Sequence, residues 1–355
     1  MSSSYAPTEI ELPPSKFGSQ TFDPTYDNTL VLDYGSFDIR LGTAGSEYPV
    51  KILPTEPSRM SVLKNTVKMD IQGIEKDVQN YTEKYNLNLV ENSLLFADPV
   101  GNSRFNKVKL MEIFMEKLNL YEVNFANQGC LSLYAHARLT GLVVDSGLFS
   151  TRVVPIVDGC YIKNGKVTSS LSGNFIDEKL KISLGNLERD FSRSQVQKIK
   201  HKICYVKKDQ NHSVKDETFK LPDGKDIVFK QEHLCEPIED LFNNQEESLQ
   251  TLAKTSINSC ELDLRRNLAG NIVLQGGNAC FSGLANRFTK ELNNVLASKN
   301  VKTLTFDKKD RASTVWIGGS ILASLSHNTS SWMKKSDYHE FGPMQLISRN
   351  NSVIE

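Results

Sequence analysis

The sequence lacks the features of a zinc-binding protein, of a small domain stabilised by disulfides and of a protein that binds polyanions. Its six cysteines are well separated and no two form a CxxC pair, which argues against a clustered zinc site and a small disulfide framework. Lys and Arg total 42 and Asp and Glu total 42, so the formal net charge of zero gives no general attraction to nucleic acid or anionic lipid. We therefore expect free thiols, no direct nucleic-acid partner and no membrane partner.

Long apolar runs are also missing. No stretch approaches the roughly 20 apolar residues of a membrane span, and residues 1–28 lack the basic start and apolar run of a signal peptide. These absences predict a cytosolic or nuclear protein. Residues 1–28 are rich in Ser, Pro and Thr and show no periodicity, so we interpret them as a flexible tail or as an arm that orders on a partner.

What the sequence does have is an alternation of apolar strand and helix patterns. With 355 residues and 39% hydrophobic content, the chain is long enough to suggest two lobes. Short apolar runs predict buried strands, and apolar spacings of three to four predict helices. The expected strands are at 29–32, 39–42, 93–96 and 271–274, a hairpin is expected over 219–229, and helices are expected near 103–118 and 284–296. This alternation favours an α/β fold.

The chain contains an internal repeat. Residues 30–40 read LVLDYGSFDIR and residues 142–152 read LVVDSGLFSTR, so Asp33 matches Asp145 and Arg40 matches Arg152. Each copy is an apolar strand, an aspartate, a glycine-containing turn and a second strand. The glycine permits a tight turn, turn N–H groups can bind an anion, and the aspartate can hold a divalent ion through its water. Two such hairpins facing each other would grip the phosphates of a nucleotide.

A third glycine turn follows another apolar strand, in the sequence NIVLQGGN at 271–278. Glycines between a strand and a helix allow the backbone to approach a flat or charged ligand. This turn is therefore a further candidate for ligand contact.

The sequence resembles actin and the actin-related proteins from about residue 30 to 349. The strongest block is VWIGGSILASLS at 315–326, followed by Trp332, Tyr338 and the Gly342–Pro343 pair. Further similar blocks are SLYA at 132–135, KICYV at 202–206 and LPDG at 221–224. Sugar kinases and chaperone ATPases of the same superfold lack these blocks, which argues against a small-molecule kinase.

The resemblance implies a two-lobed α/β fold of the actin, hexokinase and chaperone-ATPase type, with a duplicated core and a central nucleotide cleft. The implied division has a tail at 1–28 and a first lobe of 29–135 plus 313–355, which includes a short subdomain 2 near 55–78. The second lobe is 136–172 plus 246–312, and subdomain 4 is 173–245.

The resemblance also implies a role for individual residues, with ATP or ADP and Mg²⁺ (or Ca²⁺) as the bound groups. The implied phosphate contacts are Gly35, Ser36, Arg40, Ser146 and Gly147; the implied adenosine contacts are Lys200, Gly276, Gly277 and Asn278; the implied metal-side carboxylates are Asp33 and Asp145; and Gln128 would orient the attacking water.

Several residues depart from the family's pattern. Leu148 and Phe149 replace an acidic residue and a glycine of the second hairpin, and Phe37 replaces a glycine of the first, so the two rings could narrow the phosphate channel. Arg152 stands where a histidine is expected, either as a phosphate clamp or in a salt bridge. Because water positioning and charge stabilisation dominate phosphoryl transfer, these changes predict at most a weak ATPase.

The leading hypothesis is a structural subunit of a larger cytoskeletal assembly that binds nucleotide and polymerises poorly. The stretch between Gly45 and Ser93 is much shorter than in actin, and residues 244–256 lack actin's apolar plug, so filament contacts are reduced. Its partners would be protein subunits, such as actin or other actin-related proteins. The alternatives are a nuclear subunit of a chromatin-remodelling complex and an active filament-forming ATPase.

Overall fold

The computed structural model describes most of the chain in two compact units. The described residues are 29–55, 60–63, 66–84, 92–185, 191–208, 216–220, 226–297, 300–307, 310–325, 331–349 and 353–354. The first unit combines residues up to 138 with 313–353, and the second combines 139–312 with 354–355. The expected tail at 1–28 and the turn at 221–224 lie outside the described residues.

The first unit is built on a six-stranded sheet with the order β16-β7-β6-β1-β2-β3. Its strands are β1 (Thr29–Tyr34), β2 (Asp38–Thr43), β3 (Lys51–Pro54), β6 (Ser93–Asp98), β7 (Glu122–Asn127) and β16 (Met333–Lys334). The strand β1 pairs antiparallel with β2 and parallel with β6. Every residue of β1 is buried, as its unbroken apolar run predicts for a central strand.

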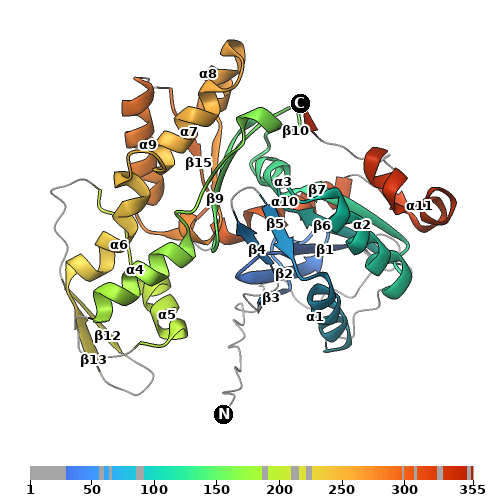
Figure 1. The fold of residues 1–355 in the computed structure, drawn as a ribbon, viewed down its shortest axis with the longest axis horizontal. Helices are drawn as coiled ribbons and strands as arrows, with labels where there is room; N and C mark the ends of the chain where they lie inside the picture. Colours follow the sequence, from blue (N-terminus) through green and yellow to red (C-terminus); the bar gives the residue numbers. More distant parts are fainter. Residues whose placement is uncertain are drawn as a thin grey trace. The chain divides into compact units, whose positions relative to one another are not determined.

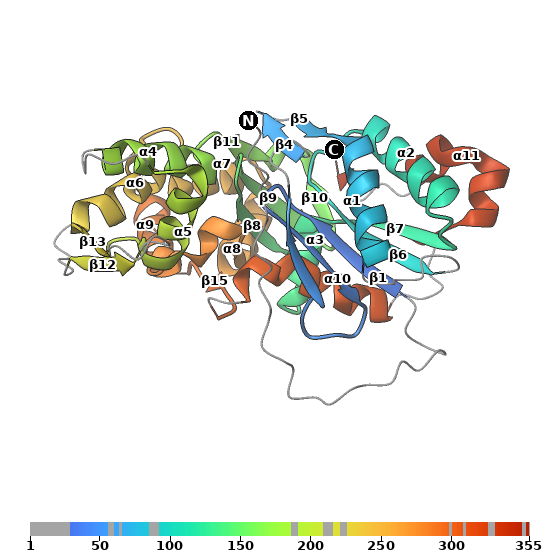
Figure 2. The ribbon, with the colours of Figure 1, turned by 90° about the horizontal axis from the view of Figure 1, so that it is seen from below.

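Helices cover both faces of this sheet (Figures 1 and 2). One face packs against helices α1 (Ile71–Lys84), α2 (Arg104–Glu112) and α11 (Lys335–Arg349). The other face packs against α3 (Gln128–Ala135) and α10 (Thr314–Leu325), with Trp316 fully buried. Alternate residues of β1 and β6 therefore enter two separate cores, which is the period-two pattern of a sheet covered on both sides.

Two local features of the first unit were predicted incompletely. The helix expected near 103–118 begins as α2, which Ser103 caps by accepting from the N–H of Asn106, but it continues as a π-helical turn at Ile113–Lys117. The expected short subdomain 2 contains a small hairpin, β4 (Met60–Leu63) and β5 (Thr66–Met69).

The second unit is built on a seven-stranded sheet whose order is β15-β14-β8-β9-β10-β17, with β11 also paired to β9. Its strands are β8 (Gly141–Ser146), β9 (Thr151–Val157), β10 (Cys160–Ile162), β11 (Val167–Ser169), β14 (Ile272–Gln275), β15 (Thr303–Leu304) and β17 (Val353–Ile354). The strand β8 pairs antiparallel with β9 and parallel with β14, which repeats the arrangement of β1 with β2 and β6.

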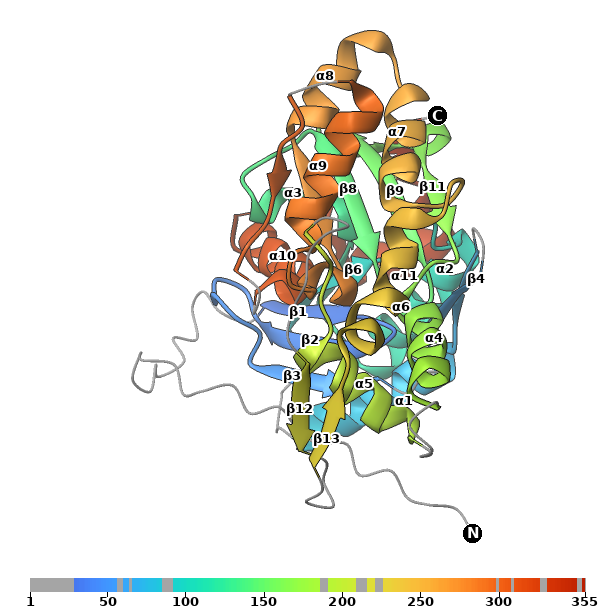
Figure 3. The same cartoon turned by 90° about the vertical axis from the view of Figure 1, so that its left-hand side faces the viewer.

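Six helices and a small hairpin form the rest of the described second unit. The helices are α4 (Gly173–Gly185), α5 (Arg193–Ile203), α6 (Gln231–Asn243), α7 (Leu249–Asn258), α8 (Leu262–Gly270) and α9 (Leu284–Leu296). The hairpin consists of β12 (Glu217–Lys220) and β13 (Asp226–Phe229). Figure 3 shows α7 and α9 along the sheet and α4, α5 and the hairpin below it. One apolar core joins these helices to the sheet.

All six cysteines are free, as the sequence predicted. Burial raises the pKa of Cys204 to about 12 and also raises the pKa of Cys235 and Cys260, so these three thiols are unreactive at neutral pH. Among the described residues, no helix combines the length and apolarity that crossing a lipid bilayer requires.

Candidate functional site

The first hairpin has a tight turn between β1 and β2. The N–H of Gly35 donates to the carbonyl of Asp38 at 3.0 Å, and a Cβ on Gly35 would lie only 2.7 Å from that oxygen. Thr55, which lies outside the hairpin in the sequence, fixes the turn with two hydrogen bonds. Its hydroxyl donates to the carbonyl of Gly35, and its N–H donates to the carbonyl of Phe37. The turn's carbonyls are therefore used by the protein, whereas the N–H of Ser36 makes no hydrogen bond to any described residue.

Asp33 lies in a buried network of charged and polar groups. Its Oδ1 accepts from Nε2 of Gln128 at 3.1 Å, and its Oδ2 lies 3.4 Å from Nη1 of Arg40, directly across the hairpin. Nη2 of Arg40 also contacts Asp38 at 3.3 Å. Burial raises the pKa of Asp38 and the arginine opposes that rise. Gln128 is placed by Asn127, whose side chain caps the start of α3.

The second hairpin repeats the geometry of the first. The N–H of Gly147 donates to the carbonyl of Ser150 at 3.0 Å, which is the bond that Gly35 makes to Asp38. Here the start of α4 holds the turn, because the N–H of Gly173 donates to the carbonyl of Gly147 and the N–H of Asn174 to that of Leu148. The N–H groups of Leu148 and Phe149 make no hydrogen bond to any described residue.

Asp145, like Asp33, is paired with an arginine on the opposite strand of its hairpin. Nη2 of Arg152 lies 2.6 Å from its Oδ2, and the two residues are opposite each other in the ladder of β8 and β9. A second cation, Lys166, lies near this arginine. Its pKa is lowered by burial and by repulsion from Arg152, and no described carboxylate forms an ion pair with it. The second hairpin thus pairs Asp145 with Arg152, and Lys166, which directly precedes β11, is the second cation near this arginine.

The glycine turn after β14 adjoins the second hairpin. Gln275 is opposite Asp145 in the ladder of β14 and β8, and Gly276 follows with φ of 88°. A Cβ on Gly276 would lie 2.4 Å from the carbonyl oxygen of Ser146, so only glycine fits. Nδ2 of Asn278 donates to Oγ of Ser146 and to the carbonyl of Gly147, both at 3.1 Å. The hydroxyl of Ser146 is buried in this network.

Lys200 is buried beneath the same region. Its Nζ lies 2.5 Å from Oδ1 of Asp177 and donates to the carbonyl of Gly173 at 3.2 Å. Burial lowers the pKa of Lys200, and the Asp177 carboxylate opposes that shift. Since Gly173 also bonds the hairpin turn, Lys200 supports the position of that turn. Its ammonium is already paired within the unit, and only 2% of the residue is exposed.

The donor groups fit a phosphate better than a divalent cation. The turn N–H groups of Ser36, Leu148 and Phe149 have no acceptor within the described part of the chain and can bind phosphate oxygens. In contrast, both oxygens of Asp33 are engaged by Gln128 and Arg40, and Asp145 is paired with Arg152. A hydrated Mg²⁺ is held through such carboxylate lone pairs. Within the part of the chain that the structure describes, no cluster of three or more acidic, His or Cys side chains could hold a metal.

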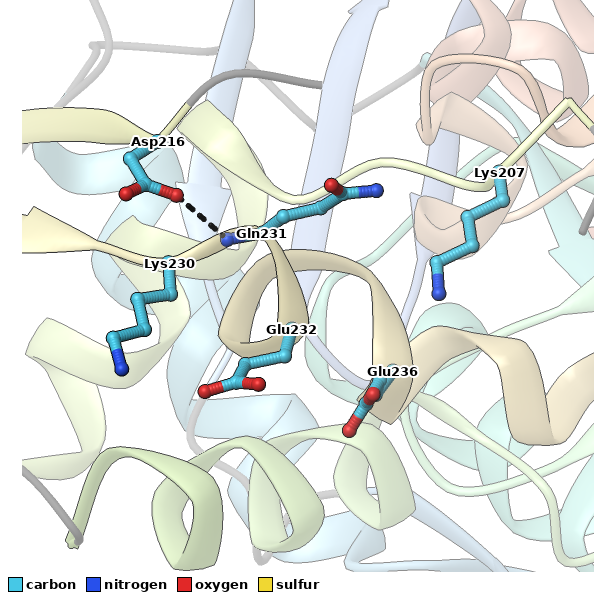
Figure 4. A pocket seen from close by; sticks show the side chains of 6 residues that line it. All are labelled: Lys207, Asp216, Lys230, Gln231, Glu232 and Glu236. Carbon is cyan, nitrogen blue, oxygen red and sulfur yellow. Dashed lines mark hydrogen bonds between the residues drawn. The ribbon is translucent and has the colours of Figure 1, made fainter. Parts of the chain in front are cut away.

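A pocket of about 360 Å³ lies elsewhere in the second unit, beside β12, β13 and α6 (Figure 4). It is lined by Lys207, Asp216, Lys230, Gln231, Glu232 and Glu236. The carboxylate of Asp216 accepts from the N–H of Gln231 at the start of α6, at 3.3 Å. Because three carboxylates stand against two ammonium groups, this pocket gives no net attraction to phosphate, and none of the predicted site residues lines it.

Comparison with known proteins identifies the family. The actin family model matches residues 75–192 and 186–351. The chain belongs to the actin family. Actin-like protein 9 of Homo sapiens is 36% identical over 272 residues, which cover 71% of this chain and 64% of that protein. The match therefore takes in less than two thirds of that relative's length. Family and fold class are as expected: each unit of this actin-family chain has a mixed sheet covered by helices.

The structure brings together more residues than the sequence indicated. In the second unit it joins Asp145, Ser146, Gly147, Gly276 and Asn278, all predicted, and Gly277 follows in the same turn. It adds Thr55, Gly173 and Asp177, which fix the turns and Lys200. Nothing in the sequence near Thr55 pointed to the first hairpin, because the contact joins residues 20 positions apart.

Neighbouring glycines at 276 and 277 provide a matched test of this arrangement. We expect Gly276→Ala to lower the free energy of unfolding by about 2 kcal/mol, because the side chain would meet Ser146 and would require a positive φ. A Cβ on Gly277 meets nothing within 4 Å, so Gly277→Ala should leave stability within about 0.5 kcal/mol of the parent. Urea denaturation measures both. Equal losses in the two variants would contradict the geometry described for Gly276.

Proposed function

We propose that this actin-family chain is a structural subunit of a larger protein assembly, which binds ATP or ADP and hydrolyses it slowly or not at all. Actin-family proteins generally bind a nucleotide and a divalent cation. The observation that carries the proposal is the repeated hairpin. Gly35 and Gly147 make equivalent turn bonds, and in each hairpin at least one turn N–H makes no hydrogen bond to any residue that the structure describes.

Nucleotide binding is supported by groups that have no evident structural use. In the first hairpin the unused N–H belongs to Ser36, and Nε of Arg40 is buried without a hydrogen-bond partner among the described residues. In the second hairpin, the N–H groups of Leu148 and of Phe149 have no acceptor among the residues described. Buried or partly buried donors without acceptors are costly, and phosphate oxygens would satisfy them. Gly277, with open space around it, remains the predicted contact for adenosine.

Slow hydrolysis is supported by the hydrogen bonds and ion pairs that the polar groups of the two hairpins make within the protein. The amide of Gln128 already uses one of its two N–H donors on Asp33, which fixes how this side chain can be directed toward a water molecule. Arg152 stands where the family has a histidine, and it is bound to Asp145. Leu148 is buried where the family has an acidic residue. Since catalysis of phosphoryl transfer depends on positioned water and charge, each change removes a contribution.

The proposed assembly is cytoskeletal and cytoplasmic, with protein subunits such as actin or other actin-related proteins as partners. A nuclear chromatin-remodelling complex is the alternative. Poor self-polymerisation follows from the short segment between Gly45 and Ser93, because less surface is available for contacts between subunits. A bound nucleotide would then act as a folding cofactor that stabilises the native state by mass action.

The first experiment is to denature the purified protein and identify the released nucleotide by chromatography. We expect about one nucleotide per chain, with ATP in excess of ADP, because binding is retained and hydrolysis is slow. ADP as the main product would show that the site turns over and would contradict the weak ATPase. A protein that neither carries nor takes up nucleotide would overturn the binding proposal.

A filament-forming ATPase is the second candidate, supported by the shared family alone. Sedimentation after addition of ATP and Mg²⁺ separates the two functions. A polymer would be found in the pellet and would release phosphate as it assembles. Protein that stays in the supernatant, with unhydrolysed ATP, is the result that the structural subunit predicts.

A further inference from the structure

We infer that Tyr34 positions the turn of the first hairpin by linking it to helix α1 through Asp77. The inference rests on the proposed nucleotide binding and concerns contacts within the first unit alone. Tyr34 is the last residue of β1 and directly precedes Gly35 and Ser36. The N–H of Ser36, which has no acceptor among the described residues, is the group proposed to bind a phosphate oxygen.

The side chain of Tyr34 is fixed at both ends. Its ring is fully buried in the core that β1 shares with α1, where Ile74 and Val78 of the helix are also buried. Its hydroxyl donates to Oδ2 of Asp77 at 2.6 Å, a contact between residues 43 positions apart. A hydrogen bond from a hydroxyl to a carboxylate is short and roughly twice as strong as one between neutral groups. The orientation of Tyr34 therefore depends on the position of α1.

This orientation matters because Tyr34 closes the hairpin. Its backbone is opposite Ile39 in the last pair of the ladder of β1 and β2, and residues 35–38 form the turn between them. Thr55 binds two carbonyls of the same turn. Since Thr55 and Asp77 both lie between β3 and β6, this one segment fixes the turn at two points. A turn donor that is already oriented binds an anion without the cost of ordering it.

The link acts in both directions, because α1 also gains stability from it. A helix of 14 residues is marginal by itself in water. A second charged contact of α1, between Glu75 and Lys117 at 2.6 Å, involves a lysine that is more than half exposed, and such pairs contribute little. Local opening of α1 would separate Asp77 from Tyr34 and loosen the turn. By linkage, a phosphate bound at the turn stabilises α1 by the same factor by which closure of α1 strengthens binding.

The test is hydrogen exchange of the α1 amides, measured by mass spectrometry on the full chain after nucleotide is stripped, with and without ATP and Mg²⁺. We expect ATP to slow this exchange at least about threefold in the parent. Helix α11, which packs on the same core, is the reference for global stabilisation and should change less. A parent that binds ATP without slowing the exchange of α1 would overturn the inference alone. A parent that binds no ATP would overturn the proposed function and this inference together.

Three substitutions show whether the hydroxyl of Tyr34 makes the link. Tyr34→Phe keeps the ring, and it should weaken ATP binding at least about fivefold and abolish the protection of α1 by ATP. Asp77→Asn keeps an oxygen that can accept from Tyr34, so it should bind ATP within about threefold of the parent and keep the protection. Lys117→Gln is the matched control, because it breaks the pair with Glu75 and leaves the hydroxyl bond in place. It should keep both the affinity and the protection of the parent.

Thermal unfolding checks that each variant is folded, and the measurement on the parent decides the inference where a variant is not. A loss of stability alone would lower the unfolding temperature without removing the response of α1 to ATP, so the two roles are separable. A folded Tyr34→Phe variant with the affinity and the ATP protection of the parent would overturn the role of the hydroxyl.

Discussion

Replacing one glycine of α10 by alanine is expected to disrupt the first unit. The Cβ of a Gly318→Ala variant would lie 1.7 Å from the carbonyl oxygen of Leu131, an approach that no rotamer change can relieve because backbone meets backbone. The helices α3 and α10 would have to separate, and Trp316 would lose its packing and its hydrogen bond to Val31. We expect the free energy of unfolding to fall by at least about 3 kcal/mol.

Alanine variants of two further glycines provide comparisons for the stability of Gly318→Ala in urea denaturation. A Cβ on Gly319 would lie 2.8 Å from a methyl of Val31, which is a side chain and can move, so Gly319→Ala should cost less than Gly318→Ala. Gly185 is the control, because a Cβ there meets nothing within 4 Å and it ends a helix, so Gly185→Ala should change stability by less than about 1 kcal/mol. Similar stabilities for the parent and the Gly318→Ala variant would show that α3 and α10 are not so closely packed.

The second large effect is expected at the buried pair beneath the second hairpin. Asp177→Asn leaves the ammonium of Lys200 charged and buried, with neutral acceptors such as the carbonyl of Gly173 but no carboxylate to balance its charge. We expect a loss of about 3–5 kcal/mol at pH 7, since an uncompensated buried charge is costly. The double variant Asp177→Leu with Lys200→Met should recover to within about 1 kcal/mol of the parent. Glu112→Gln, which breaks an exposed pair with Lys109, should cost less than about 1 kcal/mol.

The pH dependence of the Asp177→Asn variant identifies the cause of its instability. Burial already lowers the pKa of Lys200, and removal of the carboxylate lowers it further. A lysine whose folded pKa lies below the unfolded value of about 10.4 destabilises the protein below the folded pKa, and this penalty is relieved as the pH rises through it. The variant should therefore regain stability relative to the parent between neutral pH and about pH 10. A constant difference across that range would assign the loss to packing.

Much of the fold could be predicted because its central elements carry strong local patterns. The apolar runs at 29–32, 93–96 and 271–274 became central strands, and the spacing of four from Leu284 to Leu296 became α9. The π-helical turn at Ile113–Lys117 could not be predicted, because its residues have the same apolar spacing as an α-helix and tertiary packing sets the wider turn.

The site was predictable as a set of residues but not as a set of contacts. Comparison of residues 30–40 with 142–152 located Asp33, Asp145 and both arginines, seven positions after each aspartate. Their pairing depends on the register of the two ladders, which the turn geometry fixes and which the sequence alone left open. For Arg152 the sequence left two alternatives, a phosphate clamp and a salt bridge. The structure shows the salt bridge, which Arg152 makes with Asp145.

The chain path has a consequence for synthesis on the ribosome. The second unit is continuous from Leu139 to Ala312 apart from the short β17 at the C-terminus, whereas the first needs α10 from near the C-terminus to cover its sheet. Trp316 reaches Val31 across 285 residues, a stretch that takes about 15–60 s to translate at 5–20 residues per second. During that interval the apolar face of β1 and β6 has no helix α10 to shield it, so the nascent N-terminal half must wait in an aggregation-prone state while the middle of the chain folds.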